Sequence, residues 1–127
     1  MGKYVLRMEF DRMLPQLNTG HTRRHWSVGH REARRWTERL RVGMLMGRHK
    51  RPPKPLKMAL VKLWRKSSRQ PDYDNLVMSF KPVVDALVKL GLIEDDGPSH
   101  LDREYLWETA PPRQGSIVIE LTEGGRT

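Results

Sequence analysis

Residues 75–91, NLVMSFKPVVDALVKLG, predict a central helix of the fold. Apolar side chains recur three or four residues apart and so share one helical face: Leu76, Phe80, Val83, Leu87 and Leu90. Gly91 suits the C-terminal end of such a helix. Pro82 lacks a backbone N–H and crowds the carbonyl of Met78. The helix therefore either kinks at Pro82 or begins its regular part near Lys81.

Strand patterns lie on both sides of this helix. Residues 4–13 alternate, with Tyr4, Leu6, Met8 and Phe10 on one side, which indicates a half-buried strand. Residues 56–64 are apolar on both faces apart from their lysines, as in an inner strand. Two further strands are expected at 101–107 and 116–122. A first helix is expected from Ser27 to about Met46, with four core residues at helical spacing: Ala33, Trp36, Leu40 and Met44. This order predicts a small single α/β domain over residues 1–127, with a mixed β-sheet and two main helices.

The composition excludes several classes of site. The 127 residues include no Cys, which rules out disulfides, thiolate zinc sites and a Cys nucleophile. No apolar run approaches the ~20 residues of a membrane helix, and the first residues show no signal-peptide pattern. We therefore expect a cytoplasmic protein with no membrane partner.

The charge is divided unevenly along the chain. Residues 1–71 hold 19 basic and 4 acidic residues, a balance of +15, whereas residues 72–127 hold 5 basic and 11 acidic residues, a balance of −6. A basic framework around a concentrated acidic site fits this division. Polyanions, above all nucleic acids, are the expected partners.

The acidic residues gather around the central helix. Asp72 and Asp74 precede it, and Asp95 and Asp96 follow it. In an extended segment, residues two apart point to the same side, so Asp72 and Asp74 can present their carboxylates together. Mg²⁺ suits such a site because it keeps several waters and takes further ligands from substrate phosphate. Asp95 and Asp96 would complete a site for one or two metal ions.

Each acidic feature also has a purely structural interpretation. Residues 72–75 can cap a helix, and residues 95–98 can form a turn. Lys81 can be a solvated helix lysine paired with Asp85 one turn later. The concentration of acids around one helix, in a chain that is otherwise basic, favours the functional interpretation.

Basic residues close to the acidic segment are candidates for contacts with a DNA backbone. These predicted phosphate contacts are Arg23, Arg24, Arg65, Lys66 and Arg69. The last three are expected on a loop spanning residues 65–71, immediately before Asp72.

The pattern Asp72-Tyr73-Asp74-Asn75, Lys81, Asp85-Ala86-Leu87, Gly91 and Asp95-Asp96 resembles the RusA-type Holliday junction resolvases. These phage-associated endodeoxyribonucleases act in DNA recombination and repair. The core of the resemblance covers residues 71–96, and weaker similarity extends to residues 14–18 and to the closing strand. It implies an intertwined homodimer that nicks four-way DNA junctions symmetrically with Mg²⁺, for which Mn²⁺ substitutes. It also implies a phage or prophage origin and action in the bacterial host cytoplasm.

The resemblance assigns roles to four residues. Asp72, Asp74 and Asp96 correspond to the essential aspartates, with Asp95 as a further metal ligand, and Lys81 corresponds to the catalytic lysine. Five residues separate Asn75 from Lys81, three more than in the family pattern. Three helical residues turn about 300° and rise ~4.5 Å, so Lys81 would face nearly the same way one turn further along.

Two questions remain open from the sequence. The alternative function is a non-catalytic basic protein that binds DNA or RNA, in which the acids only cap and solvate. We expect a dimer, because a two-fold assembly matches a junction that needs two opposed nicks. We further expect each acidic site to form within one chain; donation of Asp95 and Asp96 by the partner subunit is the other arrangement.

Overall fold

A computed structural model describes residues 3–11 and 25–125, with side chains from residue 31 onward in the second range. Its elements are β1 (Val5–Phe10), α1 (His25–Met46), β2 (Ala59–Ser67), α2 (Tyr73–Ser79), α3 (Lys81–Lys89), β3 (Leu101–Thr109) and β4 (Ser116–Glu123). The sheet has the order β1-β4-β2-β3. Strands β2 and β3 are parallel, whereas β4 is antiparallel to both β1 and β2. The predicted α/β domain with a mixed sheet is confirmed.

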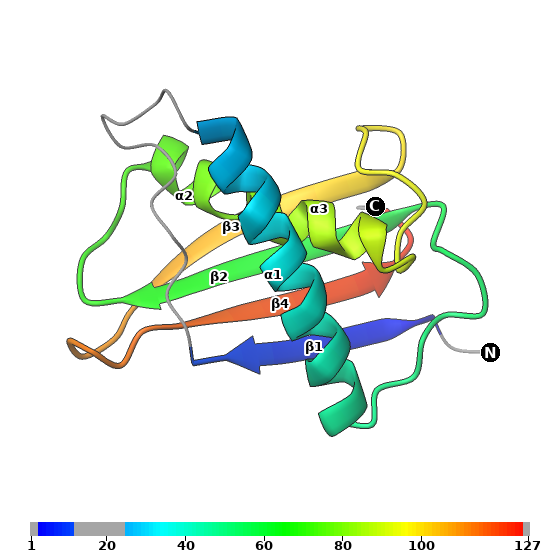
Figure 1. Ribbon diagram of the computed structural model, residues 1–127, viewed down its shortest axis with the longest axis horizontal. Helices are drawn as coiled ribbons and strands as arrows, with labels where there is room; N and C mark the ends of the chain where they lie inside the picture. Colours follow the sequence, from blue (N-terminus) through cyan, green and yellow to red (C-terminus); the bar gives the residue numbers. More distant parts are fainter. Residues whose placement is uncertain (1–2, 12–24, 126–127) are drawn as a thin grey trace.

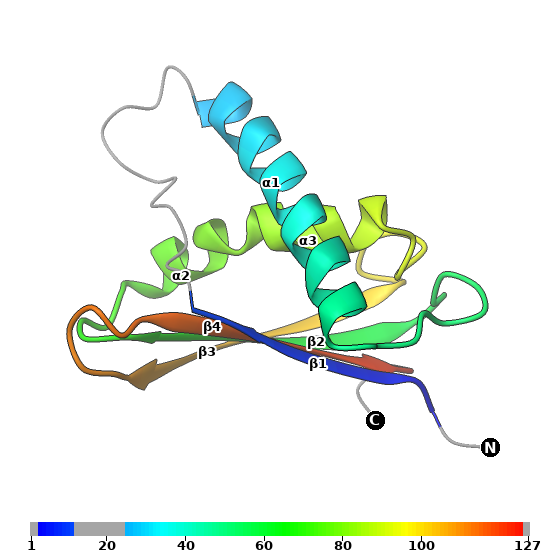
Figure 2. The ribbon, with the colours of Figure 1, turned by 60° about the horizontal axis from the view of Figure 1, so that its bottom comes forward.

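The helices lie on one face of the sheet and leave the other face uncovered (Figure 1, Figure 2). Alternation along the strands produces this division, because every second side chain faces the helices. Met8, Ile119 and Leu63 align across three strands and are buried beneath the helical layer. Trp36 and Leu40 of α1 are fully buried, as the helical spacing predicts. Together these side chains form one continuous core.

The central helix is divided at Phe80, which ends α2 and begins α3. Of the two sequence alternatives, the one in which the regular helix begins near Lys81 is confirmed. Pro82 then lies in the first turn of α3, where a missing backbone N–H leaves no hydrogen bond unmade. Gly91, at φ 78°, follows the end of α3 as predicted.

Several predicted boundaries are wrong. The strand expected at residues 4–13 spans only Val5–Phe10, the one expected at 56–64 begins at Ala59, and the one expected at 101–107 continues to Thr109. Strand β2 continues to Ser67, so the expected basic loop at residues 65–71 begins three residues later. The reason is the parallel pairing with β3, which continues as far as Ser67 opposite Thr109. Helix α1 begins at His25, two residues before Ser27, and ends at Met46 as predicted.

Among the helices that the structure describes, none has the length and apolar character needed to span a membrane.

Candidate acidic site

Asp72 stands at the N-cap position of α2. Its backbone carbonyl accepts a hydrogen bond from the Leu76 N–H at 2.9 Å, which closes the first helical turn. Its side chain makes no capping hydrogen bond and is exposed. The purely structural interpretation, in which Asp72 caps the helix, therefore assigns no contact to its carboxylate. Among the described residues, no cation pairs with Asp72.

Asp74 lies in the first turn of α2 and is also exposed. The expectation that Asp72 and Asp74 lie on one extended segment is wrong, because the helix already begins at Tyr73. Residues in a helix advance about 100° each, so side chains two positions apart do not share one side as they would in a strand. Both remain at the N-terminus of a helix, which favours negative charge.

Tyr73 lies between the two aspartates and fixes this end of α2 on the sheet. Its ring packs edge-on against Tyr105 of β3, with ring centroids 6.3 Å apart. Phe80 contacts the same Tyr105 ring from the other end of α2, at 6.2 Å. Both ends of α2 therefore contact Tyr105, and these contacts position Asp72 and Asp74.

Lys81 is exposed at the start of α3, and its Nζ lies 3.9 Å from the Asp85 carboxylate. This is the surface ion pair that the structural interpretation anticipates. Lys81 lies beyond the far end of α2 from Asp74. No described residue directs its ammonium toward Asp72 or Asp74. The catalytic role remains a prediction from the resemblance.

Asp95 and Asp96 form a turn before β3. The Asp96 N–H donates to Asp95 Oδ1 at 2.9 Å. Arg103 donates to the Asp96 carbonyl at 2.5 Å, and its guanidinium lies 3.8 Å from the Asp96 carboxylate. Asp96 is therefore already paired with a cation, in contrast to Asp72 and Asp74.

The two acidic segments lie at opposite ends of the sheet. Asp72 follows the C-terminal end of β2, whereas Asp96 precedes β3, whose Leu101 pairs with Ala59 at the N-terminal end of β2. A nine-residue strand covers about 26 Å, and Figure 1 shows α2 and the loop before β3 on opposite sides. Among the residues described, no group of three or more acids or histidines is close enough to hold a metal ion. The expectation of a site completed within one chain is therefore wrong.

The predicted phosphate contacts have different positions. Arg23 and Arg24 lie outside the described residues. Arg65 is only 6% exposed, with its side chain on the helical face of β2, which argues against a surface contact. Lys66 lies on the uncovered face, where its Nζ is 3.8 Å from Glu9. Arg69 alone of the described three is exposed on the loop before Asp72 and has no ion-pair partner among the described residues.

The sequence analysis overlooked one cation at this end of the sheet. Arg113 lies in the loop between β3 and β4 and has a positive φ of 65°. The signal was the sequence Pro111-Pro112-Arg113-Gln114, a tight-turn pattern that places an arginine where glycine is usual.

Comparison with models of known protein families finds no match to this chain, and no curated protein matches it. The resemblance to the RusA-type resolvases thus stays a prediction from the residues at 71–96.

Proposed function

We propose that this protein is a metal-dependent endodeoxyribonuclease that resolves four-way DNA junctions by paired nicks, as a phage or prophage enzyme in the host cytoplasm. The observation that carries the proposal is the pair of exposed carboxylates, Asp72 and Asp74, at the start of α2. Neither caps the helix nor joins an ion pair among the described residues. Arg69 lies three positions before Asp72, is exposed, and forms no ion pair with any residue that the structure describes. Cations beside carboxylates are what an enzyme of phosphodiester hydrolysis requires.

Two exposed carboxylates at the start of α2 are the donors that one chain offers to a magnesium ion. Mg²⁺ is commonly bound through one or two carboxylates together with water and substrate phosphate. Asp72 and Asp74 would hold the ion, which when bound can polarise a phosphodiester and lower the pKa of a water ligand. The four-carboxylate set suggested by the sequence does not fit within one chain, because Asp95 and Asp96 lie at the far end of β2.

A homodimer would supply the missing carboxylates. In this arrangement the turn with Asp95 and Asp96 of one subunit approaches the start of α2 in the other. Two equivalent centres would then match the approximate two-fold symmetry of a four-way junction. The ion pair between Asp96 and Arg103 would have to open or be shared in the assembled site.

A second candidate, a non-catalytic protein that binds DNA or RNA, is favoured by a different observation. The ion pairs of Asp85 with Lys81 and of Asp96 with Arg103 give both aspartates a structural role. The two candidates differ in one measurable property, which is cleavage of the DNA that is bound.

Nicking of a synthetic four-way junction in Mg²⁺ separates the two candidates. Asp72→Asn and Asp74→Asn should each abolish nicking while junction binding persists or tightens, because phosphate repulsion falls. Glu108→Gln is the matched control: it removes one exposed carboxylate from β3, the strand paired with β2, outside the proposed ligand set, and should cut at the wild-type rate. Wild-type cutting by either aspartate variant would exclude that residue as a ligand. A wild-type protein that binds the junction without cutting it would favour the second candidate.

Mixing two inactive variants tests the shared site. If the centres are shared between subunits, Asp72→Asn chains mixed with Asp96→Asn chains form heterodimers with one intact centre each, and nicking of one strand returns. If each centre lies within one chain, every centre in the mixture stays defective. A protein that stays monomeric at micromolar concentration, both free and on the junction, would exclude the dimer.

A further inference from the structure

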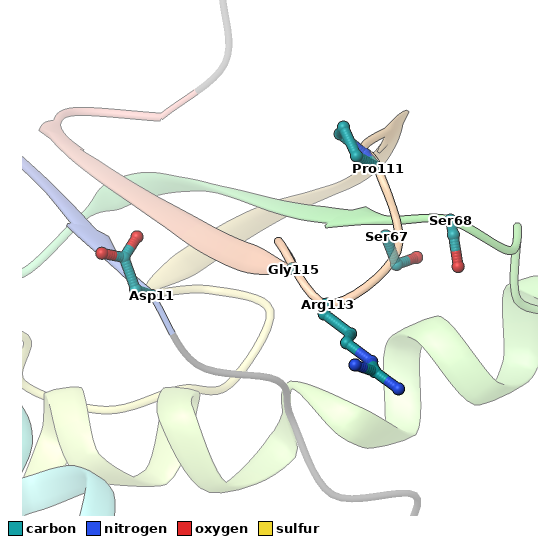
Figure 3. Close-up of a pocket in the computed structure, with 6 residues that line it drawn as sticks. All are labelled: Asp11, Ser67, Ser68, Pro111, Arg113 and Gly115. Carbon is teal, nitrogen blue, oxygen red and sulfur yellow. The ribbon is translucent and has the colours of Figure 1, made fainter.

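A cavity of about 200 Å³ opens at the end of the sheet that carries Asp72. It is lined by the ends of three strands and the β3–β4 loop: Asp11, Ser67, Ser68, Pro111, Arg113 and Gly115. Figure 3 shows the Arg113 and Ser68 side chains directed to the helical side of the sheet. The Asp11 carboxylate points away from the Arg113 guanidinium in the same view. The cavity thus combines one cation and two hydroxyl groups with one carboxylate, which is directed away from the cation.

Arg113 occupies a backbone conformation that glycine would adopt more easily. The Gln114 N–H donates to the Pro111 carbonyl at 3.1 Å and closes a tight turn with Arg113 at its third position. At φ 65° a residue with a Cβ costs about 1–2 kcal/mol more than in its relaxed conformation. The turn holds the guanidinium at the cavity, and no described residue forms an ion pair with it.

A second positive charge lies on β2 near the cavity, outside its lining. Arg65 is two residues before Ser67 on the same face of β2 and is 6% exposed. Its Nε has no hydrogen-bond partner among the described residues, and no described carboxylate is within ion-pair distance. Burial lowers the pKa of the Arg65 guanidinium, and no neighbouring anion offsets this effect. Because no described carboxylate pairs with this buried cation, an anion bound nearby would offset part of the cost of its burial.

Of the two cavity hydroxyls, Ser68 is the one that can donate to an oxyanion, because the Ser67 hydroxyl proton is already engaged. Ser67 Oγ accepts a hydrogen bond from Trp107 Nε1 at 2.9 Å and donates to the Arg69 carbonyl at 2.7 Å. These bonds fix Ser67 and the start of the loop that leads to Asp72. Ser68 is exposed, and its hydroxyl has no partner among the described residues.

We propose that this cavity binds a backbone phosphate of DNA, with Arg113 and Ser68 as the contacting side chains and Arg65 as the buried charge behind them. The inference rests on the proposed function. It adds a second contact with the same DNA strand that the acidic site would bind. Asp72 lies four positions after Ser68, a reach of at most ~14 Å. One DNA strand carries a phosphate every 3.4 Å along the axis, so the same strand can occupy both places.

The test uses two arginines with the same backbone strain. Arg113→Gly and Arg48→Gly each remove one exposed cation at a positive φ (65° and 54°) and relax the backbone, so both variants should fold. Arg48 follows α1, away from the cavity. Binding of a labelled linear duplex and of a four-way junction is measured from 50 to 300 mM salt.

Arg113→Gly should weaken binding of both DNAs about three- to tenfold and make the slope of log affinity against log salt shallower by about 0.9. Arg48→Gly should leave the slope unchanged. Inorganic phosphate should raise the melting temperature of the wild type and of Arg48→Gly, and should have no effect on Arg113→Gly. Equal slopes for wild type and Arg113→Gly would overturn the inference; with a phosphate effect still present, the cavity would be an anion site without a role on DNA.

The failures of the two proposals are distinguishable. If the wild type binds DNA but never nicks it, the proposed nuclease activity fails, while a shallower slope for Arg113→Gly still supports the phosphate site. If the wild type nicks junctions and Arg113→Gly binds them with the wild-type slope, the nuclease proposal stands and the phosphate site is wrong.

Discussion

Replacing Arg65 by methionine should make the protein more stable and at the same time a weaker DNA binder. The guanidinium is buried, its Nε is unpaired among the described residues, and no described carboxylate compensates it. An unsatisfied buried donor costs about 1–3 kcal/mol. Methionine keeps a long apolar stem between Trp107 and Ile117, the neighbours of Arg65 across the sheet. Replacement of buried charges by apolar side chains of similar volume is often stabilising by about 1–4 kcal/mol.

The expected gain for Arg65→Met is therefore about 1–3 kcal/mol in the free energy of unfolding. For a domain of this size that corresponds to a rise in melting temperature of roughly 3–12 °C. Thermal unfolding by circular dichroism measures it, with Arg69→Met as the control, because an exposed site should change stability by less than about 0.5 kcal/mol. A lower melting temperature for Arg65→Met would refute the reasoning, since it would mean that the guanidinium has satisfied partners.

Three further changes test other parts of the structure. Arg69→Ala should weaken binding of all DNA sequences alike and make the salt slope shallower by about one, and an unchanged slope would remove Arg69 from the interface. Phe80→Ala should lower the free energy of unfolding in urea by about 3–5 kcal/mol, because Phe80 is fully buried where α2 meets α3; a loss below 1 kcal/mol would contradict that packing. Tyr4 donates its hydroxyl to the Lys50 carbonyl at 2.6 Å, and burial raises its pKa against the opposing effect of Arg51. The neutral Tyr4 hydroxyl therefore contributes fully to the free energy of unfolding below pH ~10, and this contribution is lost as the pH rises through the raised pKa. Tyr4→Phe should make the decline of stability at alkaline pH less steep. It should also lower the free energy of unfolding at pH 7 by about 0.5–1.5 kcal/mol, because the hydrogen bond is lost.

Most of the fold follows from periodicity in the sequence. The pattern in β1 places Leu6 and Met8 in the core, and the helical spacing in α1 does the same for Trp36 and Leu40. These positions were predictable because burial of apolar side chains dominates the choice of face. The end of β2 was not predictable, because Arg65 and Lys66 look like loop residues until β3 pairs beside them.

Charge and motif name the candidate residues of the acidic site, whose role stays a prediction, and they do not predict its geometry. Charge and motif alone single out Asp72 and Asp74, and both are exposed and unpaired in the described part of the chain. Arg113 escaped notice because its importance depends on a turn conformation and on a cavity built from three strand ends. Neither is visible in a linear pattern.

The two acidic segments of one chain are separated because β2 and β3 run in the same direction. In a parallel β–α–β unit, the chain leaves the first strand at its C-terminal end and must enter the second at its N-terminal end. Asp72 lies just after β2 and Asp96 just before β3, and these strands are parallel in register from Ala59 and Leu101 onward. The connecting segments on each side of the helices could in principle return toward each other, because five extended residues reach about 17 Å. In this structure they do not: α2 and the loop before β3 stay at opposite ends of the sheet (Figure 1). If Asp96 does serve the same centre as Asp72, this arrangement favours its donation by another subunit.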